Sequence, residues 1–271
     1  MNLTNWDKIH FMEITPLSSR LNELNLASCR YFDTIGSTND EALRWVGEGA
    51  PDSALVLADE QTSGRGRMQR TWVTRPGVAL AFSQIFIPSQ SEKSFLQLYS
   101  PLAALAVADA LEELYSLNPR IKWPNDVLLF EKKVCGILVE ASWLGNEIQA
   151  IVVGVGINIL QGSVPSHGEL IFPATCVEEV LRRPIDRFDI LRVVLQRMAY
   201  WRQNIGSSSF FQTWQEKLAF AGEMVFIQRP GMDVLVGKVL GVDPSGNLRL
   251  GQNDGDEILV STGDVQTRRV K

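Results

Sequence analysis

The sequence is poor in histidine and cysteine, the side chains that most often build metal and nucleophile sites. Its 271 residues include two histidines, His10 and His167, and three cysteines, Cys29, Cys135 and Cys176. The cysteines are far apart, so they form no CxxC pair, zinc spacing or disulfide framework. Three reduced thiols of a cytosolic protein are the simplest interpretation. Histidine metal sites and Ser or Cys triads are poor candidates, since a GxSxG motif is also absent.

Long uninterrupted hydrophobic runs are absent as well. The most apolar helical stretch, 96–114, contains three acidic residues, which predicts a core helix rather than a membrane span. Near the N-terminus, Asp7, His10 and Glu13 interrupt any signal-peptide core. The formal net charge of -5 argues against a broad nucleic-acid-binding surface but allows a local basic site. These features predict a globular protein of one large domain or two.

Two nucleotide-binding signatures are missing. The chain has no GxxxxGK[ST] loop, and GVGINI (154–159) has Ile159 where a dinucleotide fingerprint has its last glycine. The remaining candidates for chemistry are arginine, lysine, asparagine, aspartate and the glycine backbone. Such groups act through charge and positioning, which predicts transfer at phosphorus above all.

Hydrophobic patterning predicts a mixed α+β region followed by a small β module. Strands are expected at 53–60, 78–87, 137–143 and 147–156, the last two joined as a hairpin. Helices are expected at 37–46, 95–115 and 186–205. In the first helix, Thr38 and Glu41 have the spacing of a capping box. After residue 221, short apolar segments separated by turns predict a small all-β barrel.

Residues 64–70 read GRGRMQR, a flexible and basic segment in an acidic chain. Glycine permits positive φ and close approach to a ligand, and successive N–H groups can form an anion-binding nest. Arg65, Arg67 and Arg70 add donors that match carboxylate and phosphate oxygens. The segment therefore predicts a loop that closes over an anion. A solvated basic surface loop is the alternative.

Four other stretches place polar residues and glycines near predicted element ends: GSTND (36–40), IKWPNDVLL (121–129), KKVCGILVE (132–140) and GVGIN (154–158). Each also has a simple structural explanation as a helix cap, a turn, a solvent-facing lysine or glycines chosen for packing. Lys122, Asn125 and Asp126 nonetheless bracket a strand end where a nucleotide could bind. Gly136, soon after Lys133, indicates close backbone approach.

Taken in order, STN, EQTSGRGR…R.W, KWPND, K..GILVE and GVGIN resemble the motifs of the biotin–protein ligase family, in the form without an N-terminal DNA-binding domain. The resemblance covers residues 31–160 well and the C-terminal module loosely. It implies an α+β fold with the mixed sheet of class II aminoacyl-tRNA synthetases and biotin ligases, followed by an SH3-like barrel. The implied division is a leader (1–30), a biotin- and ATP-binding catalytic domain (31–220) and the barrel (221–271).

The resemblance also implies a two-step reaction. Biotin is adenylated with ATP to biotinyl-5′-AMP, and the biotinyl group then passes to a lysine of a biotin carboxyl carrier protein. Biotin and ATP are thus substrates, and Mg²⁺ is expected to bind mainly through the ATP phosphates. A cytoplasmic enzyme without DNA or membrane partners is expected. Relatives that associate through the edge of the catalytic sheet suggest a homodimer as a hypothesis.

Site residues follow from the same resemblance. The implied biotin-binding residues are Ser37, Thr38, Asn39, Gln61, Gly64, Arg65, Gly66, Arg67, Lys133, Gly136 and Gly156. The implied ATP- or adenylate-binding residues are Arg67, Arg70, Trp72, Lys122, Asn125, Asp126, Lys133 and Asn158. Lys133 and Arg67 are the implied catalytic residues, with Lys133 stabilising the charge that develops during adenylation. Asp126 is the candidate protein ligand for Mg²⁺.

One position departs from the family pattern, and two alternatives stay open. Gln69 stands where the family loop usually has a third glycine, and its side chain is expected to stiffen or slow loop closure. One alternative is a lipoate- or octanoate–protein ligase of the same superfamily, although GRGR with KWPND favours biotin. The other is a non-catalytic regulator that binds biotin or nucleic acid. Against it stand residues 1–30, too few for a winged helix, and the presence of Lys133 and Arg67.

Overall fold

The computed structural model describes residues 20–24, 26–165, 172–229, 231–252 and 255–266. Expectations for residues 1–19 of the leader, and for His10 and His167, lie outside these ranges. The chain divides into two compact units, Met1–Ser94 with Val134–Val193, and Phe95–Lys133 with Val194–Lys271. The domain limits expected at 30/31 and 220/221 stay a prediction.

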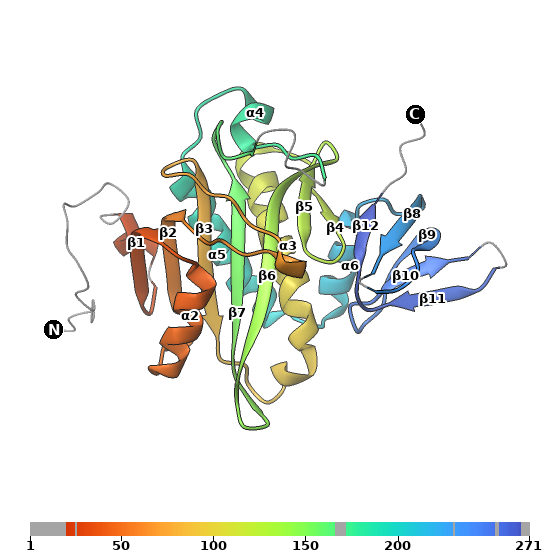
Figure 1. Ribbon diagram of the computed structural model, residues 1–271, viewed down its shortest axis with the longest axis horizontal. Coiled ribbons are helices and arrows are strands. Elements are labelled where there is room, and N and C mark those ends of the chain that lie inside the picture. The colour runs from red at the N-terminus through yellow and green to blue at the C-terminus, as the bar shows by residue number, and fades with distance from the viewer. Residues whose placement is uncertain (1–19, 25, 166–171, 230, 253–254, 267–271) are drawn as a thin grey trace. The chain divides into compact units, whose positions relative to one another are not determined.

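Five neighbouring strands form a mixed sheet in the order β1-β2-β3-β7-β6 (Figure 1), and all but the first two residues of β6 belong to the first unit. β1 and β2 are parallel, and the other neighbours are antiparallel. β3 is buried along its whole length and β7 over most of its length, as expected of central strands with apolar side chains on both faces. The predicted strands and the hairpin are confirmed. Their bounds are β1 (Cys29–Ile35), β2 (Leu55–Gln61), β3 (Ala79–Phe86), β6 (Lys132–Leu144) and β7 (Glu147–Asn158).

Helix α2 (Thr38–Gly47) packs on one face of this sheet against β2, β3 and β7, and Figure 1 shows it in front of β2 and β3. Its apolar side recurs every three to four residues and meets alternate residues of the strands, which gives a continuous core. This core consists of Ala42, Trp45, Val46, Ala50, Ala54, Val56, Ile85, Ala150 and Val152. The helix is therefore fixed on the sheet, with Asn39 near its start against Ser83 of β3 and Gly154 of β7.

The capping box expected at the start of α2 is wrong. Ser37, not Thr38, is the N-cap residue, and its side chain makes no capping hydrogen bond. Thr38 is the first helical residue, and its hydroxyl donates to Gln61 Oε1 instead. The Glu41 carboxylate is paired with Arg30 and Arg44. The side chains of Thr38 and Glu41 therefore bond other side chains, from β2, β1 and α2 itself, rather than the helix backbone.

The second unit contains the KWPND stretch and the C-terminal strands. The hairpin β4 (Arg120–Lys122) and β5 (Asp126–Leu129) packs with α3 (Tyr99–Tyr115), and α6 (Ser208–Lys217) packs with β4, α3 and β9. Trp123 Nε1 donates to Gly246 O at 3.0 Å, which joins the KWPND turn to the turn between β9 and β10. Two further helices complete the described chain, α4 (Val177–Leu181) in the first unit and α5 (Arg187–Gln203), which passes from the first unit into the second.

The C-terminal strands form an antiparallel sheet in the order β11-β10-β9-β8-β12, which confirms the expected all-β module at this level. Their bounds are β8 (Met224–Gln228), β9 (Leu235–Val242), β10 (Leu248–Gly251), β11 (Glu257–Val260) and β12 (Asp264–Gln266). Along β9, buried and exposed residues alternate, because one face packs inward and the other faces outward.

One described helical segment, Glu92–Tyr115, is long and apolar enough to cross a membrane. It combines the 3₁₀ turns of Glu92–Leu98 with α3, and 67% of its most apolar window is buried inside the protein. This burial agrees with the prediction of a core helix.

Candidate active site

Three adjacent strands carry mostly small residues beside the N-terminal end of α2. We call the surface formed by Ala81, Ser83, Gly136, Gly154 and Gly156 the floor. Gly154 of β7 lies between Ser83 of β3 and Leu138 of β6, and Gly156 lies between Ala81 and Gly136 in the next row. Successive rows on one sheet face are two residues apart, so these rows continue the face that carries the α2 core. The predicted glycines Gly136 and Gly156 are therefore direct cross-strand neighbours.

Asn39 lies on this floor, and the protein itself fixes the orientation of its amide. Its Oδ1 is 2.6 Å from Ser83 Oγ, and its Nδ2 donates to the Leu138 carbonyl at 3.3 Å and to Glu140 Oε2 at 2.7 Å. A Cβ at Gly154 would overlap the Asn39 amide, so only glycine leaves room for it. The Asn39 side chain is thus buried and held by both strands.

Thr38, Gln61 and Ser83 continue this hydrogen-bonded network. Gln61 Oε1 accepts from the Thr38 backbone N–H at 2.8 Å and from the Thr38 hydroxyl at 3.0 Å. Ser83 Oγ lies 2.8 Å from Thr38 Oγ1. Thr38, Asn39 and Ser83 are buried, and buried polar groups that satisfy one another are held rigidly; Ser37, which directly precedes them, is buried too. The structure therefore brings together the predicted Ser37–Asn39 and Gln61, and it adds Ser83.

The GRGR segment forms an antiparallel loop, Gly64–Trp72, called the Gly64–Trp72 hairpin below. Trp72 N donates to Gly64 O at 2.9 Å, and Gly66 N donates to Arg70 O at 2.7 Å. Its tip is a 3₁₀ turn over Arg67–Gln69, in which Met68 and Gln69 have φ of 55° and 58°. Arg67 begins this turn and Arg70 follows it, so both lie near the tip of the hairpin.

The expectation that the GRGR glycines supply positive φ is wrong. Gly66 has φ of -124°, and Gly64 is not among the positive-φ residues. A Cβ at Gly64 would overlap the Trp72 carbonyl, whereas a Cβ at Gly66 would lie 3.5 Å from Arg70 O, an ordinary contact. Gly64 therefore serves the close approach of the two hairpin strands, and the positive φ falls on Met68 and Gln69.

Arg65 is paired with two carboxylates of the first unit. Its NH1 and NH2 groups donate to Glu140 Oε1 at 2.9 Å and Oε2 at 2.8 Å, and NH2 also donates to Asp40 Oδ1 at 2.6 Å. The hydrogen bond to Glu140 is the main reason that the pKa of Arg65 is raised above its ordinary value. Neither Glu140 nor Asp40 was assigned a role from the sequence. Glu140 is the last residue of the K..GILVE stretch, which is the signal that could have found it.

Trp72 covers the floor at Gly156. A Cβ at Gly156 would overlap the Trp72 indole, so the ring lies directly on the glycine backbone. Trp72 was expected on the nucleotide side, and Gly156 as a flat wall for biotin. In this structure the indole occupies that wall.

Three predicted residues meet in the second unit. Asp126 Oδ1 is 2.6 Å from Lys133 Nζ, and Asp126 Oδ2 is 2.9 Å from Lys122 Nζ. Burial by itself raises the pKa of Asp126, but the attraction of Lys133 and Lys122 is stronger, so the net pKa is lowered. Two lysines around one carboxylate leave a net positive group. Asn125 lies in the turn beside it, where Trp123 is buried.

Asn158, at the end of β7, is buried, and its Nδ2 donates to the Thr175 carbonyl at 3.2 Å. The predicted residues thus form two groups. The first unit holds Ser37, Thr38, Asn39, Gln61, Gly64, Arg65, Gly66, Arg67, Arg70, Trp72, Gly136, Gly156 and Asn158, and the second holds Lys122, Asn125, Asp126 and Lys133.

The described residues contain no group of three or more His, Cys, Asp or Glu side chains that could hold a metal ion. Asp126 has an ammonium group on each carboxylate oxygen, an arrangement that does not favour a cation ligand. Cys29, Cys135 and Cys176 are free thiols, and burial raises the pKa of Cys29 to about 12. Cys29 is therefore held as an unreactive thiol.

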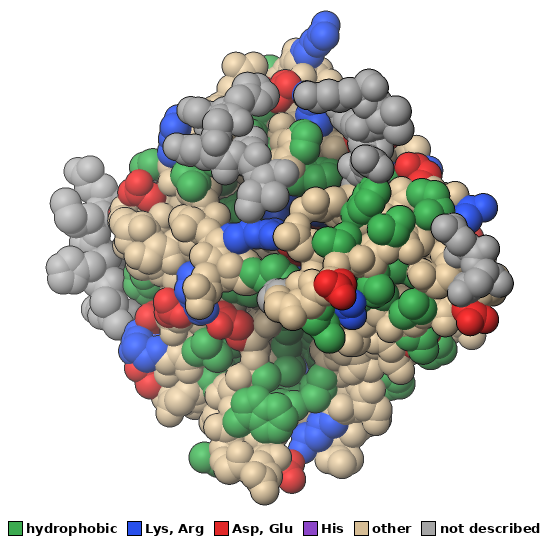
Figure 2. Space-filling view, turned by 45° about the vertical axis from the view of Figure 1, so that its right-hand side comes forward, with side chains coloured by type: hydrophobic (Ala, Val, Ile, Leu, Met, Phe, Trp, Pro, Cys, Tyr) green, Lys and Arg blue, Asp and Glu red, His purple; other side chains and the backbone are tan. Residues whose placement is uncertain are grey.

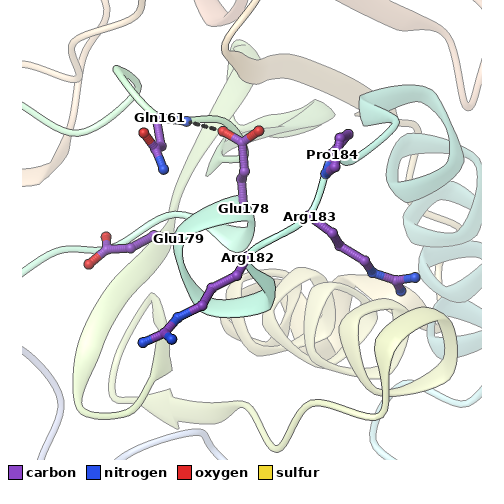
Figure 3. Close-up of a pocket in the computed structure, with 6 residues that line it drawn as sticks. All are labelled: Gln161, Glu178, Glu179, Arg182, Arg183 and Pro184. Atoms are coloured by element: carbon purple, nitrogen blue, oxygen red, sulfur yellow. Dashed lines mark hydrogen bonds between the residues drawn. The ribbon is translucent and has the colours of Figure 1, made fainter.

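A surface cavity of about 560 Å³ lies elsewhere in the first unit, around α4 (Figure 3). Its lining residues are Gln161, Glu178, Glu179, Arg182, Arg183 and Pro184, none of which was predicted as a site residue. Glu178 accepts from the Gln161 backbone N–H at 2.8 Å. Figure 3 shows Arg182 and Arg183 pointing in different directions, so they do not converge on one ligand.

Comparisons with known proteins agree on one family. Residues 31–158 match the model of the biotin/lipoate A/B protein ligase family. The biotin–[acetyl-CoA-carboxylase] ligase of Paracoccus denitrificans is 36% identical over 231 residues, covering 82% of this chain and 94% of that protein. The bifunctional ligase/repressor BirA of Bacillus subtilis is 32% identical over 233 residues, covering 85% of this chain and 71% of that protein.

Solved structures give the same answer for the fold. The biotin protein ligase from Aquifex aeolicus in complex with biotin and ATP has a TM-score of 0.76 and 29% identity. The match covers 89% of this chain and 99% of that one. The arrangement of elements described above is therefore that of a biotin protein ligase.

Proposed function

This chain belongs to the biotin/lipoate A/B protein ligase family, and from that premise we propose that it activates biotin with ATP and transfers it to a lysine of a biotin carboxyl carrier protein. The enzyme is a biotin–protein ligase. The observation that carries this proposal is the network of Thr38, Asn39, Gln61 and Ser83 above a floor of small residues, in a family whose solved members bind biotin and ATP.

In the first step, a biotin carboxylate oxygen forms a bond to the α-phosphorus of ATP, and the bond to the pyrophosphate oxygen breaks. The products are biotinyl-5′-AMP and pyrophosphate. Two anions repel each other in this step, so cationic side chains lower the barrier. Lys133 and Lys122 supply that charge, and Asp126 holds both ammonium groups in place. Arg67 and Arg70 add donors at the tip of the hairpin.

In the second step, the unprotonated lysine amine of the carrier attacks the acyl carbon of the mixed anhydride. AMP leaves, the amine loses a proton, and an amide forms. The anhydride reacts with water in the same way, so a closed site protects it. The Gly64–Trp72 hairpin is the element that we assign to this closure. Trp72 must leave the Gly156 floor if biotin is to lie there.

Biotin recognition falls to the polar network. Ser37, Thr38, Asn39 and Gln61 hold hydroxyl and amide groups in fixed orientations, which suits a neutral ureido ring. Gly136 and Gly156 leave space for a flat ring system. Mg²⁺ enters with the ATP phosphates, because the described residues offer no carboxylate cage for it.

Finer features of the fold follow from the same family membership. We infer that β8–β12 close into an SH3-like barrel and that the larger sheet has the class II aminoacyl-tRNA synthetase arrangement. On the face seen in Figure 2, the Lys and Arg side chains of described residues are dispersed among acidic and apolar ones. This face therefore lacks the gathered basic side chains that are typical of a DNA-binding face.

The test is transfer to an acceptor. The purified protein is incubated with ATP, Mg²⁺, biotin and a biotin carboxyl carrier domain, and the carrier is followed by intact mass. One biotinyl addition is expected, lost when the acceptor lysine is replaced by arginine. Addition of lipoyl or octanoyl groups, with none of biotin, would move the protein to the sister activity. No transfer of any of them would favour the regulator.

A further inference from the structure

Glu140 connects two parts of the candidate site that are far apart in the sequence. Its Oε2 accepts from Asn39 Nδ2 at 2.7 Å, and its two oxygens accept from Arg65 at 2.9 Å and 2.8 Å. Asn39 belongs to the floor network, and Arg65 belongs to the Gly64–Trp72 hairpin. One carboxylate thus joins the residues assigned to biotin recognition with the loop assigned to closure.

The geometry of this contact indicates that Glu140 and Arg65 hold the hairpin in place and are not an incidental surface ion pair. Arg65 and Glu140 meet in a bidentate arrangement, which is stronger and more directional than a single contact. The Glu140 side chain is 25% exposed and starts from β6, where Glu140 lies opposite Val152 of β7, so it is anchored on a paired strand. Asp40, from the first turn of α2, adds a second acceptor for Arg65 at 2.6 Å.

The charges show what Arg65 does. Its NH1 and NH2 groups both point at protein carboxylates, and the group of Arg65, Glu140 and Asp40 carries a formal charge of minus one. A guanidinium held in this way stabilises the hairpin and does not serve as a donor to an incoming anion. This interpretation differs from the role that family resemblance gives Arg65, which is to bind biotin.

We propose that Glu140 is a positioning residue that latches the Gly64–Trp72 hairpin to the floor and fixes the Asn39 amide that faces biotin. Its two contacts tie loop closure to the orientation of the recognition network. The kinetic part of this inference rests on the proposed function, whereas the latch itself is a property of the protein without substrates.

The test uses Glu140→Gln, which keeps the shape of the side chain and removes its charge. Hydrogen exchange is measured on the ligand-free protein at the Gly66 and Trp72 amides, which are bonded across the hairpin. Loss of a charge-assisted bond predicts exchange about tenfold faster there. The β3 amides are expected to be unchanged, which shows that the sheet is intact.

A matched control is available on the same strand pair. Glu147→Gln removes one carboxylate from β7, but Glu147 is exposed and pairs with Lys93 at 2.8 Å, away from the hairpin. It is expected to match the unsubstituted protein in exchange and in turnover. Arg65→Gln removes the other half of the latch, and the double variant with Glu140→Gln is expected to be no worse than either single variant.

Turnover separates positioning from a merely structural role. Glu140→Gln is expected to raise the KM for biotin about tenfold, with the KM for ATP and kcat changed less than about threefold. Unchanged hairpin exchange would overturn the latch. A lower KM for biotin would overturn it too, because Glu140 would then compete with biotin for Arg65. If the unsubstituted protein does not turn over biotin, the proposed function fails, and hydrogen exchange still decides the latch.

Discussion

Gly64 and Gly66 stand two positions apart in one hairpin, yet an added side chain would meet different surroundings at each. At Gly64 a Cβ would overlap the Trp72 carbonyl, and at Gly66 it would make an ordinary contact. We expect Gly64→Ala to destabilise the hairpin by about 1–3 kcal/mol, the usual cost of overpacking, and Gly66→Ala to have little effect. Hydrogen exchange at the Trp72 amide reports the difference. Equal effects of the two substitutions would contradict this assignment.

Asp126 predicts a pH dependence of stability in the second unit. Its pKa is lowered in the folded protein, so it binds fewer protons there than in the unfolded chain. Its contribution is therefore full above the ordinary value of 3.8 and is lost as pH falls through the folded pKa. Asp126→Asn leaves two ammonium groups without their carboxylate and is expected to lower the free energy of unfolding by about 3–5 kcal/mol near neutral pH.

Urea unfolding at a series of pH values measures this effect. The difference between Asp126→Asn and the unsubstituted protein is expected to shrink below pH 3.8. Glu223→Gln, an exposed carboxyl of the same unit, serves as the control and is expected to change stability by less than about 0.5 kcal/mol. A difference that stays constant with pH would show that the charge of Asp126 is not what stabilises the pair.

Residues of the site were predictable where they interrupt a local pattern, and not where they follow one. STN before a helix and GRGR after a strand are unusual for their positions, and both lead to the first-unit group. Ser83 and Glu140 look like ordinary strand residues. Their role depends on the strand register and on the placement of Asn39, whose partner Glu140 is 101 residues away.

In the Gly64–Trp72 hairpin, a residue that has a side chain adopts a positive φ. Gln69 has φ of 58°, in the left-handed region that costs a residue with a Cβ about 1–2 kcal/mol. The expectation that Gln69 hinders the loop now has a physical reason. Glycine removes this cost but gives the open loop more freedom, which offsets about 0.4–1 kcal/mol.

Gln69→Gly is therefore expected to favour the closed hairpin by up to about 1 kcal/mol and to slow the loss of biotinyl-5′-AMP to solvent about two- to fivefold. Gln69→Ala keeps the Cβ and its cost, so it is expected to behave like glutamine. The half-life of enzyme-bound adenylate measures both. Faster loss in the glycine variant would mean that a stiff tip, rather than an unstrained one, keeps the site closed.

Most helices and strands could be predicted from the spacing of their apolar residues, but the residues at which they begin and end could not. The strands at 53–60 and 78–87 and the β6–β7 hairpin agree with the structure because period-2 and apolar runs identify half-buried and buried strands. The start of α2 was mispredicted because Thr38 and Glu41 fit a capping box locally. In the structure, Thr38 bonds Gln61 of β2, and Glu41 pairs with Arg30 of β1 and with Arg44 of the same helix. Tertiary contacts decided between two plausible partners.

Across the whole chain, the order of weak motifs predicted the family, but the sequence did not reveal the division into two units. Composition changes near residue 221, which suggested a boundary there. The structure groups the C-terminal strands with the KWPND hairpin, since Ala219 N donates to Ile121 O at 2.8 Å and Trp123 donates to Gly246. Such a grouping joins segments that are far apart in the chain, and composition carries no signal for it.

Pyrophosphate exchange reports whether this chain adenylates biotin. Labelled pyrophosphate, ATP and Mg²⁺ are incubated with the purified protein, with biotin present or absent and with lipoate or octanoate in its place. We expect exchange of label into ATP that requires biotin and that neither lipoate nor octanoate supports. Exchange without biotin, exchange with lipoate or octanoate alone, or no exchange under any of these conditions would contradict it.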